Sequence, residues 1–178
     1  MKKTILCLSL IALSFTACKN EAKTDENKEE KVQVEEKEEN TENLPLAFTS
    51  EKQYEIARLY LDLKEALTNE DSYASKKISE IIVIKFNDTK EEENKKIAQT
   101  IVDNEENIEA QREAFYQLST NLAPAFEKNI TGGKLYKQYC PMAFDGKGAF
   151  WFSSEKEIMN PYFGDKMLKC GEVQDIIK

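Results

Sequence analysis

Sulfur-bearing side chains are the residues of this chain whose types and spacing suit a specific chemistry. Cys140 and Met142 lie two residues apart in the stretch YCPMAFDGKGAFW, and Met167 and Cys170 lie three apart further on. Side chains two apart on a strand face the same side, and those three apart on a helical turn share a face. Thiolate and thioether ligands select Cu(I), and Ag(I) by the same softness argument, and the chain has no histidine. The spacing therefore predicts a Cu(I) or Ag(I) site formed by Cys140, Met142, Met167 and Cys170.

The N-terminus has the features of a lipoprotein signal peptide. Two lysines precede an apolar run over residues 5–15, which is too short to span a membrane as a stable helix. The segment FTAC, residues 15–18, resembles a lipobox, in which the chain is cut before a cysteine that carries lipid. We therefore expect residues 1–17 to be removed and Cys18 to be lipidated, on the extracytoplasmic side of a bacterial envelope, facing the periplasm or the cell surface. An ordinary secretory signal would lead to the same compartment.

Residues 18–49 are predicted to form a disordered tether behind the lipidated cysteine. From residue 19 to 46 the sequence is almost wholly charged or polar and has no aromatic side chain, so it cannot bury enough surface to fold. The formal net charge of the chain is −8, which opposes binding to nucleic acid and to anionic headgroups. We expect the membrane contact to come from the lipid on Cys18.

The cysteines also support a second interpretation. One of the four lies in the predicted signal peptide and Cys18 carries the lipid, so Cys140 and Cys170 remain in a compartment where disulfides persist. A disulfide between them would close a loop of about thirty residues and contribute roughly 3 kcal/mol of stability. Met142 and Met167 would then fill gaps in an aromatic core. The disulfide and the metal site both remain open, and they are not exclusive, because a reduced pair can bind metal.

Residues 50–178 are predicted to form one mainly α-helical domain, a small up-and-down four-helix bundle. Capping-box spacing marks helix starts at Ser50 and Thr89, and the cluster at 69–72 separates the first two helices. We expect Pro124 to end or kink the fourth helix. The apolar stripes at helical spacing are Ile56, Tyr60, Leu63 and Leu67; Tyr73, Ile78, Ile81, Ile82 and Ile84; Ile97, Ile101 and Ile108; and Ile108, Phe115, Leu118 and Leu122.

A short aromatic-rich lobe, a β-hairpin with loops, is predicted to follow the helices. Asp145-Gly146 between two apolar runs is a hairpin signal, and Pro141 in the first arm indicates an edge position or a bulge. Residues 154–157 are expected to form a single helical turn, which Asn160-Pro161 ends.

The aromatic residues of this lobe have two interpretations. Packing is the default for rings of this size. The functional alternative is that Trp151 shields a Cu(I) site, or that it belongs to a docking surface with Tyr139, Tyr162 and Phe163.

Two long motifs resemble a known family. The stretch YKQYCPMAFDGKGAFWFSSEKEIMNPYFGDKMLKCGEV and the preceding NIEAQREAFYQLS are similar to those of an extracytoplasmic family catalogued as a domain of unknown function, number 3347. The resemblance implies a lipoprotein, and a domain that also occurs on periplasmic adaptor subunits of heavy-metal efflux pumps. QYCPM is also similar to the Tyr-x-Cys-Pro-Met-His-Pro core of a heavy-metal-binding module, but Ala143 and Phe144 stand where that module has His and Pro.

An enzyme is not expected, because the chain has no histidine base, no Gly-x-Ser-x-Gly elbow and no Cys-x-x-Cys pair. The leading hypothesis is an envelope lipoprotein that binds Cu(I) or Ag(I), in buffering or in hand-over to an efflux system, with an efflux adaptor or another envelope protein as partner. The alternative is a non-catalytic interaction module stapled by the Cys140–Cys170 disulfide.

Overall fold

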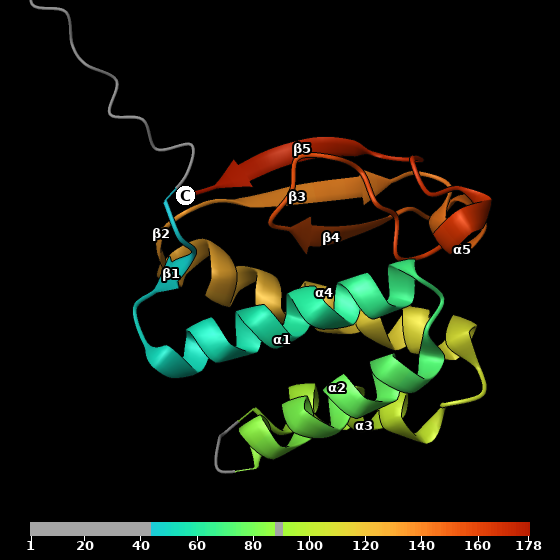
Figure 1. Cartoon of the computed structure of the whole chain (residues 1–178), viewed down its shortest axis with the longest axis horizontal. Helices are drawn as coiled ribbons and strands as arrows, with labels where there is room; N and C mark the ends of the chain where they lie inside the picture. Colours follow the sequence, from blue (N-terminus) through green and yellow to red (C-terminus); the bar gives the residue numbers. More distant parts are fainter. Residues whose placement is uncertain (1–43, 88–90) are drawn as a thin grey trace, which may run out of the picture. The chain divides into compact units, whose positions relative to one another are not determined.

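The computed structural model describes residues 44–87 and 91–178, and all of these belong to one of the chain's two units, residues 38–178. The predicted signal peptide, Cys18, most of the tether and the helix start at Thr89 lie outside the described residues. The described part is mainly helical with a C-terminal strand region, as predicted (Figure 1). Its elements are β1 (Ala47–Phe48), α1 (Glu51–Thr68), α2 (Ser72–Phe86), α3 (Glu92–Asp103), α4 (Ile108–Asn129), β2 (Ile130–Gly132), β3 (Leu135–Cys140), α5 (Ala143–Gly146), β4 (Ala149–Ser153), the 3-10 turn η2 (Gly164–Lys166) and β5 (Glu172–Ile177).

Side-chain caps set the starts of three helices. The Ser50 side chain accepts from the Gln53 amide at the start of α1, as its capping-box spacing predicts. Asp71 caps α2 and Asn107 caps α4 in the same way, through bonds of 2.8 and 3.1 Å. Each cap satisfies one of the amides that a helix leaves without an internal partner. None of the helices in the described part has the length and apolarity needed to cross a membrane.

The expectation that Pro124 ends the fourth helix is wrong, because α4 continues through it to Asn129. Proline removes one helical hydrogen bond and costs about 3 kcal/mol in a helix interior. Here Pro124 lies on the exposed side of α4, and the carbonyl that loses its partner belongs to Thr120, which is also exposed. Leu122 and Phe126 on either side are buried, so packing of the inner face carries the helix past the proline.

The apolar stripe predicted for α2 is wrong in part. Tyr73, Ile81 and Ile84 are 58%, 45% and 63% exposed, while Ile82 is buried. The buried face consists of Ser75, Ser79, Ile82 and Phe86, which follow helical spacing. This face contacts α1 and α3, and its two serines have small side chains, which suit close packing of helices.

The sheet packs against the helices through aromatic rings. Strands β4, β3 and β5 form a three-stranded antiparallel sheet in that order, and β4 contacts α1 and α4 (Figure 1). Phe152 of β4 lies 6.2 Å from the Tyr60 ring and 5.4 Å from that of Phe126, and Tyr60 stacks on Phe115 at 4.9 Å. These rings form the core between the helical layer and the sheet.

The predicted hairpin is present, but its turn differs from the expected one. β3 and β4 pair from Tyr136↔Ser153 to Cys140↔Ala149, and residues 141–148 connect them. Within this connection Phe144 and Asp145 adopt left-handed backbone angles, with φ of 52° and 57°. Pro141 follows the last residue of β3, which is the central strand, so the predicted edge position is wrong. Residues 154–157 form bends rather than the expected helical turn.

Replacing Tyr60 by phenylalanine is expected to lower the free energy of unfolding by about 1 to 3 kcal/mol, because a buried amide loses its partner. The Tyr60 hydroxyl is fully buried, shares a 2.7 Å hydrogen bond with Ser119 of α4 and accepts one of 3.1 Å from the Phe152 amide of β4. Urea denaturation measures the change. Tyr73→Phe, at an exposed position of α2, is the control and should change stability by less than about 0.5 kcal/mol.

Candidate functional site

The register of the sheet turns Cys140 away from the helices. Side chains of directly paired residues lie on the same face of an antiparallel sheet. Gln138 pairs with Trp151, and Cys140 lies two residues beyond Gln138, so these three side chains share one face. Phe152, the neighbour of Trp151, points the other way into the helical core. Cys140 therefore lies on the outer face of the sheet.

The segment after β4 covers this outer face. The amide of the Gln138 side chain donates to the carbonyls of Glu155, Lys156 and Glu157, at 2.8, 3.2 and 3.1 Å. Tyr162 packs edge-on against Trp151, with ring centroids 5.8 Å apart. These contacts tie residues 154–171 to the sheet and form a second, smaller core around Trp151 and Cys140.

The structure brings Cys140 and Cys170 together. Their Sγ atoms lie 3.3 Å apart and both thiols are free. Cys140 is fully buried, whereas Cys170 is partly exposed. The hydrogen bond with Cys140 and, secondarily, burial raise the pKa of the Cys170 thiol. A cation that binds here must therefore displace thiol protons, and its binding strengthens as the pH rises.

Asn160 positions Cys170, a role that the sequence reasoning did not assign. Asn160 is fully buried, and its side-chain amide donates to the Cys170 carbonyl at 2.8 Å. Its side-chain oxygen accepts from the Tyr162 amide at 2.8 Å, and its own amide donates to the Leu168 carbonyl at 2.9 Å. The Asn160-Pro161 turn thus holds both ends of the loop that carries Cys170. An asparagine before a proline signals a turn, and the partner of its amide comes from the tertiary fold.

Arg112 of α4 is a second residue that the sequence did not single out. It is 1% exposed, and its Nε donates to the Pro161 carbonyl at 2.9 Å. Its Nη atoms reach the carboxylates of Glu109 and Glu70, at 2.9 and 3.2 Å, and the Leu67 carbonyl at 3.4 Å. The guanidinium therefore joins the cysteine-bearing loop to α1 and α4.

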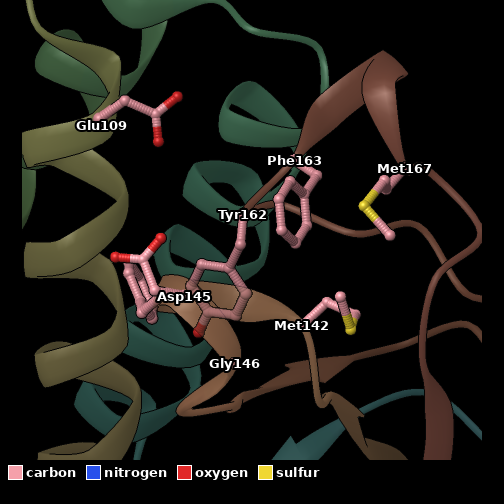
Figure 2. A pocket seen from close by; sticks show the side chains of 8 residues that line it. Glu109, Met142, Asp145, Gly146, Tyr162, Phe163 and Met167 are labelled. Carbon is pink, nitrogen blue, oxygen red and sulfur yellow. The ribbon is translucent and has the colours of Figure 1, made fainter.

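The two methionines lie apart from the cysteine pair. Met142 and Met167 line a cavity of about 560 Å³, which neither cysteine lines (Figure 2). The spacing that predicted a shared strand face for Cys140 and Met142 fails, because β3 ends at Cys140 and Met142 lies in the turn, 54% exposed. The structure brings the two thiols together, and the two methionines line one cavity.

The aromatic side chains differ in burial. Trp151 and Tyr162 are buried, which leaves them unavailable as an exposed docking surface. Tyr139 and Phe163 are partly buried. Trp151 shares the sheet face of Cys140, as a covering residue would, and its Nε1 is buried with no hydrogen-bond partner within the described part of the chain. Burial also raises the pKa of the Tyr162 hydroxyl, so this group stays protonated.

Comparison with known proteins identifies a family for the helical part of the chain. No significant match was found among curated proteins or among solved structures. One family model matches a segment of the chain that begins within α1 and ends with β2, before Cys140, which is the first of the sulfur-bearing residues of the lobe. Residues 56–132 match the family described as Protein of unknown function (DUF3347), which confirms, for this segment, the family predicted from the sequence.

Proposed function

We propose that this protein is a non-catalytic, lipid-anchored envelope protein that binds Cu(I) or Ag(I) between the thiolates of Cys140 and Cys170. Helices α1–α4 serve as the scaffold, in the up-and-down bundle expected from the sequence. The ion is buffered there or handed over to an efflux system. The observation that carries the proposal is the 3.3 Å approach of the two sulfur atoms, with Cys140 on the sheet face that also carries the buried Trp151.

The surroundings of the thiols suit a soft cation. Two thiolates select Cu(I) or Ag(I) over harder ions. One face of the pair is closed by the apolar core around Trp151, and Asn160 fixes the backbone of Cys170 before any ion arrives. Ligands held in this way lose little conformational freedom on binding, which favours affinity.

Binding requires a movement of one cysteine. A Cu(I) or Ag(I) ion held by two thiolates alone prefers a linear arrangement, and two bonds of about 2.3 Å then hold the sulfur atoms about 4.6 Å apart, compared with 3.3 Å here. Cys140 lies in the central strand and is fully buried, so its position is fixed. Cys170 lies in a turn and is partly exposed, so its side chain is the part that moves while Asn160 holds its backbone.

The test is a Cu(I) titration of reduced residues 19–178, which retain the whole unit 38–178, against a competing chelator. We expect one equivalent to bind tightly enough to compete with the chelator. The Cys140→Ser/Cys170→Ser variant should lose this tight equivalent, with an affinity lower by more than about 100-fold, beyond what loss of an outer-shell partner costs. Met159→Leu removes a sulfur atom that accepts a hydrogen bond from Lys169, so it is the matched control and should bind normally. Unchanged stoichiometry in the double variant, with a native melting curve, contradicts the proposal.

The same short sulfur distance favours a second candidate, the disulfide-stapled interaction module. In an oxidising compartment the adjacent thiols would join and close the loop that covers the sheet. Intact-mass measurement after thiol alkylation separates the two functions. Two alkylated thiols in the native protein support metal binding, whereas no free thiol together with no metal uptake supports the module, with an efflux adaptor or another envelope protein as its partner.

A further inference from the structure

The cavity that holds the two methionines has a composition of its own. Its remaining lining residues are Glu109, Phe144, Asp145, Gly146, Tyr162 and Phe163. Figure 2 shows the thioethers of Met142 and Met167 on the same side of the cavity, near the Phe163 ring, with the two carboxylates on the other side. Thioethers, aromatic faces and carboxylates all favour a positively charged occupant.

A strained turn builds one wall of this cavity. Phe144 and Asp145, between Met142 and Gly146, have positive φ, and such angles cost of order 1–3 kcal/mol at residues other than glycine. The Phe144 ring packs on those of Tyr116 and Tyr162, at 5.6 and 5.2 Å, and this packing holds the turn in place. Met142 and Asp145, in and beside this turn, both line the cavity. Strain that the surroundings maintain is typical of functional sites.

The chemistry of the cavity points to a soft monovalent ion. A thioether binds such an ion without losing a proton, so it needs neither high pH nor a reduced thiol. The Asp145 carboxylate raises the local concentration of cations, whereas the Glu109 carboxylate is paired with Arg112. Methionine side chains are unbranched and flexible, and a cavity of about 560 Å³ leaves room for both to turn inward around one ion.

We propose that this cavity is a second, thioether-based site for Cu(I) or Ag(I), at which the ion is captured before it reaches the cysteine pair. Met142 follows Cys140 by two residues and Met167 precedes Cys170 by three, so each thioether belongs to the segment that carries one thiol. The proposal rests on the proposed function for the identity of the ion. It goes beyond that function because the methionine site binds its ion even when Cys140 and Cys170 are oxidised or replaced.

The experiment uses residues 19–178 with Cys140→Ser/Cys170→Ser, labelled with ¹³C in the methionine methyl groups and titrated with silver nitrate. We expect the methyl signals of Met142 and Met167 to shift together and to saturate at one equivalent. Met159, which is absent from the cavity, should not shift. Met142→Leu and Met167→Leu keep the side-chain volume and should each weaken binding at least tenfold, since each removes one of two ligands.

Two results would overturn the inference: no shift of either methyl group, or equal shifts of all three methionines, which would mean unspecific binding to thioethers. The companion titration of the wild type keeps the two proposals apart. If the wild type binds through its thiols and the methionine signals of the variant stay fixed, the second site is wrong and the proposed function stands. If the methionine signals move and the thiols take up no metal, the second site stands and the proposed binding of the ion by Cys140 and Cys170 is wrong.

Discussion

Replacing Arg112 by alanine is expected to lower the free energy of unfolding by about 3 to 5 kcal/mol, the range typical of a broken buried charge network. The guanidinium is 1% exposed and bonds to the carbonyls of Leu67 and Pro161. Without it the Pro161 carbonyl loses its partner in a buried position, at about 1–3 kcal/mol, and a cavity remains. The Leu67 carbonyl keeps only its 3.3 Å hydrogen bond from the Glu70 amide. The carboxylates of Glu70 and Glu109 are partly exposed and can be hydrated, so they add little to the loss.

Urea denaturation measures this loss, and hydrogen exchange locates it. Because Arg112 holds the Pro161 carbonyl, the amides of the cysteine-bearing loop should lose protection before those of α1. Arg58→Ala is the control, since Arg58 is 60% exposed and its closest approach to Asp62 is 4.0 Å, and it should cost less than about 1 kcal/mol. A loss below about 1 kcal/mol in the Arg112 variant would contradict its role as the link between the helices and the loop.

The helical part of the fold follows from local signals. Ser50, Asp71 and Asn107 cap helices because their short side chains reach amides in the next turn, and this depends only on sequence. The face that a helix buries is a tertiary property. The buried face of α2 contains Ser75 and Ser79, while Ile81 and Ile84 are exposed, so the hydrophobicity of single residues did not indicate which face is buried.

The sequence could indicate which residues belong to the candidate site, but not how these residues are arranged in space. The spacing of Cys140 and Met142 places them on one face only if the strand continues, and β3 ends between them. Met167 and Cys170 lie in a turn after η2, where the Cys170 amide donates to the Met167 carbonyl. The pairing of thiol with thiol depends on how residues 154–171 fold over the sheet, and no local pattern encodes that path. Asn160 and Arg112 both bond to residues of this segment, so their roles also depend on its tertiary path.

Gly171 suggests a turn from the sequence alone, and the structure shows why a glycine is needed there. A glycine after Cys170 suggests a turn, and its φ of 146° lies where other residues are rarely found. A Cβ at this position would lie 2.8 Å from the Tyr139 carbonyl oxygen and 3.1 Å from the Trp151 ring. Tyr139 precedes Cys140, and Gly171 follows Cys170. The missing side chain therefore allows the two cysteine-bearing segments to approach one another.

Gly171→Ala is expected to lower the free energy of unfolding by about 2 to 6 kcal/mol, the sum of about 1–3 for the strained backbone and about 1–3 for overpacking. It should also weaken Cu(I) binding at least tenfold, since the backbone of β3 cannot give way and the Cys170 segment must move outward. Gly146→Ala separates the two causes, because Gly146 has a φ of 82° and no atom within 4 Å of its added Cβ. That control should cost about 1 to 2 kcal/mol and leave thiol binding unchanged. Equal losses of stability and affinity in both variants would show that backbone strain, and not the close approach of the two segments, explains the glycine.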